Sequence, residues 1–240
     1  SRGNATDFGD LVEAAQEQGA ASNGHGGLEE FQPRAPELYS PTGKVVPRGG
    51  GVGDICVNIG GARSDGDDGR VGFIKISSLG NETDFGDQAT TAQTGGAVAS
   101  STRAVSGGGY TPSNTNVIQY LEFATKGNMA DFGDRTNSVQ QVGGASNSTR
   151  GIFAGGETVN VVDYITIATV GNATDFGDLS ANRSAPAGIA SSTRALFAGG
   201  YEPSRVNTVD YFTIASASNA TDFGDLSATR SQMGSASSST

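Results

Sequence analysis

Short runs of apolar residues, separated by polar and glycine-rich segments, recur along the whole chain of 240 residues. In the clearest unit, residues 191–229, one apolar run covers residues 195–198 and the next covers residues 208–215. Such short runs, bounded by Gly, Ser, Asn or Asp, are typical of β-strands rather than helices. The pattern therefore predicts an all-β protein built from short strands.

One of these strands can be aligned in four copies, because apolar residues occupy the same columns in each. The aligned columns are Val71, Ile118, Val162 and Val209, then Phe73, Tyr120, Tyr164 and Tyr211, then Ile76, Phe123, Ile167 and Ile214. Apolar residues therefore lie on both faces of this strand. A strand of that kind is covered on both sides by neighbouring layers.

The tetrapeptide Asp-Phe-Gly-Asp marks the period of the repeat. It occurs five times, with its phenylalanine at Phe8, Phe85, Phe132, Phe176 and Phe223, and the spacings are 77, 47, 44 and 47 residues. A period in the forties is typical of small sheets repeated in a ring or array. Four short strands fit in each unit, which predicts the four-stranded blades of a β-propeller.

Two glycine-rich features support this interpretation. Gly-Gly pairs follow one strand of each unit, at Gly60-Gly61, Gly108-Gly109, Gly155-Gly156 and Gly199-Gly200. Glycine permits a positive φ at such a strand end. A run of small residues, as at Gly144-Ala145-Ser146, fits an innermost strand crowded around a central axis. We expect the Asp-Phe-Gly-Asp segments to form turns capped by their own aspartates.

We expect one propeller domain over residues 1–240, with an inserted loop or arm at residues 24–52, which carry four prolines. Four blades are visible, at about residues 15–89, 90–136, 137–180 and 181–227. A ring of five requires disguised strands in the insert, and a larger ring requires a longer chain. Because the chain begins inside a repeat without an initiator Met, we expect it to be a piece of a longer protein or a processed product.

Composition excludes several classes of function. The formal net charge is −10, and only 15 Lys and Arg are spread over the chain, which disfavours a nucleic-acid partner. No apolar run approaches 18 residues, so we expect no membrane span. The single cysteine, Cys56, allows no disulfide within the chain and aligns with Ala104 and Ala195, so it is expected to be a small buried side chain.

The candidate chemistry is sparse. Five copies of Asp-Phe-Gly exclude the kinase interpretation of that motif, and His25, the only histidine, lacks partners for zinc or a catalytic triad. Asp65, Asp67 and Asp68 are the best candidates for calcium, although a solvated acidic turn is the favoured interpretation. We therefore expect no catalytic, cofactor-binding or metal residues, and no enzymatic activity.

The columns resemble the kelch repeat. The segment Phe197-Ala198-Gly199-Gly200, then Asp210-Tyr211, Phe223, Arg230 and Gly234-Ser235-Ala236 follow the order of that repeat. The chain departs from the family in two ways: phenylalanine replaces its usual tryptophan, and its arginine is found only at Arg183 and Arg230. The nearly identical sequences of the repeats also resemble kelch-like repeat proteins of marine bacteriophages, especially tail and virion-surface components.

This resemblance implies a nonenzymatic structural or interaction protein, a component of a phage virion surface or tail. Its expected partners are other virion proteins or a host surface receptor or glycan, within a larger assembly at the virion surface or outside the cell. The alternative is a secreted or surface carbohydrate-binding module, in which Tyr110, Tyr201 and loop acids bind the sugar.

Overall fold

Four four-stranded antiparallel sheets make up the fold, and the described part of the chain contains no helix. The structure is a computed structural model that describes residues 19–22, 55–63, 66–67, 69–76 and 78–236. The all-β prediction and the four-stranded units are confirmed. Phe8, His25 and the expected insert at residues 24–52 lie outside the described residues.

Each sheet follows the chain in order from its first to its fourth strand. The first sheet contains β1 (Gly19–Ser22), β2 (Ile55–Ile59), β5 (Arg70–Lys75) and β6 (Thr83–Asp87). The second contains β7 (Gly96–Ala99), β8 (Arg103–Thr111), β9 (Ser113–Glu122) and β10 (Ala130–Asp134). The third contains β11 (Gly143–Ser146), β12 (Arg150–Ala154), β13 (Val161–Thr166) and β14 (Thr174–Asp178). The fourth contains β15 (Ala187–Ala190), β16 (Arg194–Ala198), β17 (Val206–Thr213) and β18 (Thr221–Arg230). A separate hairpin, β3 (Ala62–Arg63) with β4 (Gly66–Asp67), joins β2 to β5.

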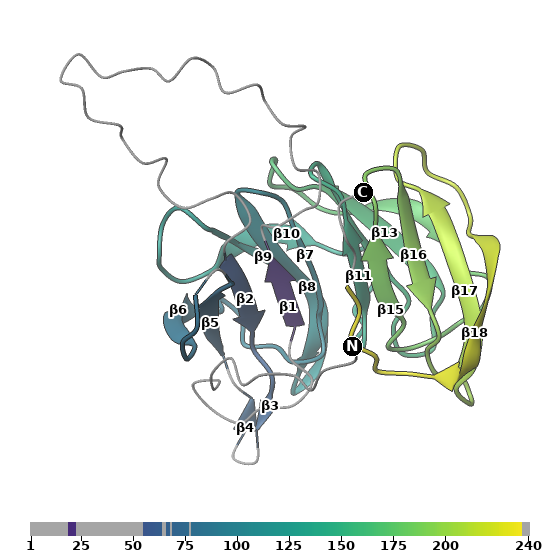
Figure 1. Cartoon of the computed structure of the whole chain (residues 1–240), viewed down its shortest axis with the longest axis horizontal. Helices are drawn as coiled ribbons and strands as arrows, with labels where there is room; N and C mark the ends of the chain where they lie inside the picture. The colour runs from purple at the N-terminus through teal and green to yellow at the C-terminus, as the bar shows by residue number, and fades with distance from the viewer. Residues whose placement is uncertain (1–18, 23–54, 64–65, 68, 77, 237–240) are drawn as a thin grey trace, which may run out of the picture.

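The first strands of the four sheets pack side by side, β1 against β7, β7 against β11 and β11 against β15. In Figure 1, β1, β11 and β15 lie toward the middle of the molecule, whereas β6 and β18 lie at its left and right margins. A Cβ at Gly144 would clash with the backbone of Ala97, and one at Gly143 would lie 2.6 Å from the Pro186 carbonyl oxygen. Small residues are therefore required where these strands crowd together.

The hydrophobic core lies between successive sheets rather than within one. Between the third and fourth sheets, Phe176 from β14 packs with Phe212 and Ile214, and all three side chains are buried. The equivalent layers between the other sheets contain Phe132 and Phe85. Each sheet therefore depends on its neighbour to exclude water from its apolar face.

The four described Asp-Phe-Gly-Asp segments are strands, not turns, which corrects the expectation from sequence. They form β6, β10, β14 and the start of β18, and a β-bulge at the glycine interrupts the pairing with the third strand. The aspartate does bind the local backbone, since Asp175 Oδ1 accepts a hydrogen bond of 3.1 Å from the Gly177 amide. A bulge bends the strand and increases its twist, which turns this edge toward the next sheet.

The four sheets form an open row in the described part of the chain. Phe85, Phe132 and Phe176 are at most 4% exposed, whereas Phe223 in the last sheet is 54% exposed because no further described sheet covers it. The architecture is consistent with the blades of a β-propeller, and no closed ring is detected among the described residues.

Candidate binding face

Equivalent connections emerge at the same end of every sheet, so the molecule has two distinct faces. The Gly-Gly face carries the connections from the second to the third strand of each sheet, including the β3–β4 hairpin at the bottom of Figure 1. The Ser-Thr-Arg face carries the tight turns between first and second strands, at residues 100–102, 147–149 and 191–193. The turns of the Ser-Thr-Arg face are nearly identical in sequence, whereas the connections on the Gly-Gly face differ from blade to blade. Diversity on a constant scaffold is typical of a binding surface.

The Gly-Gly pairs join each sheet to the connection that follows it. All eight glycines of the four pairs have positive φ; the values are 65° at Gly155 and 138° at Gly156. The Gly155 amide donates to the Val161 carbonyl within its own sheet, and the Gly156 amide donates to the Arg183 carbonyl at 3.1 Å. A Cβ at Gly155 would clash with that Arg183 carbonyl. These pairs therefore fix the base of each loop on the Gly-Gly face.

A pocket of about 480 Å³ opens on this face between loops of the third and fourth sheets. We call it the Tyr201 pocket. Its lining includes Tyr201, Glu157, Glu202 and Arg205, together with Gln232 from the segment after β18. The Tyr201 side chain is 50% exposed, and the ring offers an apolar surface beside carboxylates, a guanidinium group and an amide.

Hydrogen bonds hold the walls of the Tyr201 pocket in place. Tyr201 and Ser184 exchange two backbone hydrogen bonds, of 2.9 Å and 3.0 Å. The Glu157 carboxylate accepts a bond of 2.9 Å from the Gln140 amide. Arg205 Nε donates to Ser231 Oγ at 3.3 Å. Groups held in this way lose little conformational freedom when a ligand binds.

A second cavity, of about 340 Å³, adjoins the Tyr201 pocket where the first strands begin. The two cavities share Gln141, Ala185 and Gln232 in their linings. Thr94, Gln141, Ala185 and Gln232 are equivalent residues of successive connections, and all four have positive φ, between 49° and 60°. The repeat thus places one turn with a positive φ in each of these connections, and three of the four residues carry polar side chains. Tyr110, the other tyrosine expected to bind sugar, does not line either cavity.

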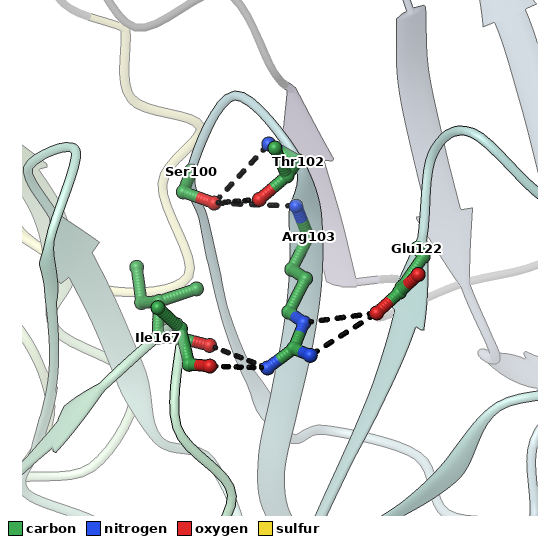
Figure 2. Close-up of polar contacts among 6 residues, drawn as sticks. Ser100, Thr102, Arg103, Glu122 and Ile167 are labelled. Carbon is green, nitrogen blue, oxygen red and sulfur yellow. Dashed lines mark hydrogen bonds and ion pairs between the residues drawn. The ribbon is translucent and has the colours of Figure 1, made fainter.

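On the Ser-Thr-Arg face, polar side chains join one sheet to the next. Figure 2 shows that Arg103 reaches the next sheet, where its Nη1 atom donates to the carbonyls of Ile167, at 3.2 Å, and of Ala168, at 2.9 Å. The same guanidinium pairs with Glu122 and lies over the Tyr120 ring, 4.7 Å from its centroid. Arg150 repeats the contact one sheet later, donating to the Ile214 carbonyl at 2.7 Å. These polar groups are therefore occupied within the scaffold.

Two buried ion pairs also link the sheets. Arg135 Nε lies 3.0 Å from Asp163 Oδ2, and Arg183 pairs with Asp210 in the fourth sheet. Burial lowers the pKa of both arginines, while the facing aspartates oppose that shift. An arginine with so high an intrinsic pKa stays charged under these influences. The pairs therefore act in the architecture and not in proton transfer.

The remaining sequence candidates do not form a reactive or metal-binding group in the described part of the chain. Asp65 and Asp68 lie outside it, the backbone of Asp67 belongs to β4, and no cluster of three or more potential metal ligands occurs among the described residues. Cys56 is half-buried rather than buried like its equivalents Ala104 and Ala195. Burial and the Glu82 carboxylate raise the pKa of its thiol, so the reactive thiolate is scarce at neutral pH. No described helix has the length and apolar character to cross a bilayer.

Sequence reasoning missed most of the Tyr201 pocket and a set of contacts between sheets in which the side chains of Asn128, Asn172 and Asn219 accept hydrogen bonds from backbone amides. An asparagine precedes the outer strand of each later blade, as in Gly171-Asn172-Ala173, and its repetition was the signal that could have revealed its role. Glu157 and Arg205 carry no such signal, because they do not recur at equivalent positions, and the recurrence of glutamine at Gln141 and Gln232 does not by itself indicate a pocket. Only the fold brings them together.

Comparison with known proteins does not assign the chain to a family. No protein-family model matches the chain, and no curated protein matches it either.

Proposed function

We propose that this protein is a nonenzymatic, kelch-like β-propeller that serves as a virion surface or tail component of a phage. In this proposal the blades surround a common axis, and the Gly-Gly face contacts either another virion protein or a receptor on the host surface. The negative charge of the chain keeps it from adhering to anionic surfaces without specificity.

The proposal rests on a difference between the polar residues that recur in several units and those that vary from unit to unit. The repeated polar residues, such as Arg103, Arg150 and Asp163, are engaged in contacts between sheets. The residues that differ between blades gather instead around the Tyr201 pocket, where Tyr201 is half exposed. A rigid scaffold that presents variable loops on one face is suited to recognition.

The Tyr201 pocket also supports a second candidate, a carbohydrate-binding module outside any particle. Tyrosine combines an apolar ring with a polar tip, and Glu157, Glu202 and Arg205 supply hydrogen-bonding groups around it. This combination fits a polar ligand with one apolar face, such as a sugar ring.

The test starts from the phage that encodes the chain. Mass spectrometry of purified particles should detect its peptides, and particles carrying Tyr201→Ala should adsorb to the host about tenfold less well if the ring is an energetic hot spot. Val170→Ala is the matched control, since Val170 is 52% exposed but lies on the Ser-Thr-Arg face. We expect that variant to adsorb normally.

The outcomes separate the two candidates. Absence of the chain from purified particles would contradict the virion role. Binding of the isolated chain to a glycan array, lost in Tyr201→Ala, would then favour the carbohydrate-binding module. If the chain is present in particles and neither variant alters assembly or adsorption, the assignment of the Gly-Gly face is wrong.

A further inference from the structure

Successive outer strands are joined by a contact that has the same form at each interface. At the junction of the second and third sheets, the Gly171 amide donates to the Phe132 carbonyl at 2.7 Å, and the Ala173 amide donates to the Asp134 carbonyl at 2.8 Å. Between them, Asn172 Oδ1 accepts a hydrogen bond of 3.0 Å from the Asp134 amide. We call this three-bond contact the asparagine clasp.

The asparagine recurs at the other two interfaces, whereas its neighbours vary: Gly127 and Met129 flank Asn128, and Ser218 and Ala220 flank Asn219. Asn128 Oδ1 accepts from the Asp87 amide at 3.1 Å, and Asn219 Oδ1 accepts from the Asp178 amide at 3.2 Å. It needs a glycine in the acceptor strand, because a Cβ at Gly133 would lie 2.6 Å from the Gly171 carbonyl oxygen. The acceptor is therefore the Asp-Phe-Gly-Asp strand, and the donor segment is Gly-Asn-Ala or a close variant.

The acceptor strand of the fourth sheet is free among the described residues. Phe223 is 54% exposed, and a Cβ on Gly224 would meet nothing within 4 Å. Gly224 nevertheless keeps the positive φ of its equivalents, 129° against 136° at Gly177. The strand β18 thus has the acceptor conformation without an occupant.

The sequence contains a further donor segment outside the described sheets. Residues 3–10 read Gly-Asn-Ala-Thr-Asp-Phe-Gly-Asp, and residues 171–178 have the identical sequence. Within residues 171–178, Gly171, Asn172 and Ala173 form a clasp. Eight residues lie between Asp10 and Gly19 at the start of β1, as eight lie between Asp134 and Gly143 at the start of β11. This is the spacing expected of the outer strand of a blade that precedes the first sheet.

The other end of the chain starts a blade in the same way. After β18, the Gln232 amide donates to the Ala185 carbonyl at 3.3 Å, and Ser235 Oγ donates to the Gly188 carbonyl at 2.7 Å. Residues 232–235 therefore lie beside β15, where the first strand of a fifth blade belongs. In a closed ring, the blade after the fourth sheet and the blade before the first sheet are the same blade.

We propose that residues 3–10 of the same chain dock on β18 through an asparagine clasp, with Asn4 accepting the hydrogen bond of the Asp225 amide, and so close the row into a ring. The proposal concerns the fold and does not depend on the viral role. A tethered segment has a high effective concentration at its site, which favours this occupant over a second copy.

Amide hydrogen exchange in the full chain tests the proposal. We expect the Asp225 amide to be protected in the wild type, as the Asp134 and Asp178 amides are. In Asn4→Ala we expect exchange at Asp225 to accelerate about tenfold, the equivalent of one hydrogen bond, while Asp134 and Asp178 stay unchanged and report that the sheets are folded. Gly224→Ala, which blocks the acceptor strand, should have the same effect.

Two results would overturn the proposal. One is exchange at Asp225 that is equally fast in the wild type and in Asn4→Ala. The other is protection that disappears on dilution by about a hundredfold together with a fall in molar mass, because mass action would then identify a second copy as the occupant.

Discussion

At the scale of single residues, the buried charges show how one position between sheets can be filled by different chemistry. Asp163 and Asp210 are fully buried and face arginines, whereas the equivalent Gln119 donates to Gln88 at 2.8 Å. Among the described residues, the Nη1 and Nη2 atoms of Arg135 have no hydrogen-bond partner. Removal of its one carboxylate partner therefore leaves a buried charge uncompensated, and we expect Asp163→Ala to reduce the free energy of unfolding by about 3–5 kcal/mol. Urea unfolding followed by circular dichroism measures this loss.

The double variant Arg135→Met/Asp163→Leu is the matched control, because it removes both charges and retains apolar volume. Such replacements are often neutral or stabilising, so we expect the double variant to be more stable than Asp163→Ala. If Asp163→Ala unfolds at the wild-type urea concentration, the ion pair does not hold these sheets together.

At the scale of the element, the outer strand shows which features of the fold can be predicted from sequence and which cannot. The apolar columns and the period of the tetrapeptide predicted an all-β fold with four strands in each unit, because burial on both faces of a strand leaves a direct trace in sequence. The bulge at Gly133 was not predicted, since Asp and Gly equally favour a turn. Nor were the paired arginines, because Arg135 and Arg183 stand at different positions of the repeat and meet equivalent aspartates only in the fold.

The asparagine clasp allows a direct test of whether the close approach between successive outer strands contributes to stability. Gly133 and Gly171 face each other across one contact, and both have positive φ, so alanine at either costs about 1–3 kcal/mol in backbone strain. Only at Gly133 would the new Cβ also meet the opposing carbonyl, at 2.6 Å, whereas Gly171 has free space. We expect Gly133→Ala to be the more destabilising by about 2 kcal/mol, because it also weakens the clasp. Equal unfolding midpoints for the two variants would show that the close approach is unimportant.

At the scale of the whole molecule, the contribution of a side chain to stability depends on the position of its sheet in the row. Phe176 and Phe223 stand in identical tetrapeptides and contact equivalent tyrosines, Tyr164 and Tyr211, in edge-to-face geometry. Phe176 is 1% exposed because the fourth sheet covers it, whereas Phe223 is 54% exposed. We expect Phe176→Ala to cost about 3–5 kcal/mol, as for other buried phenylalanines, and Phe223→Ala to cost about 1 kcal/mol or less, as for surface positions. Chemical unfolding of both variants measures the difference. A large loss in Phe223→Ala would mean that a complete further blade, and not only the docked segment of residues 3–10, covers β18 in solution.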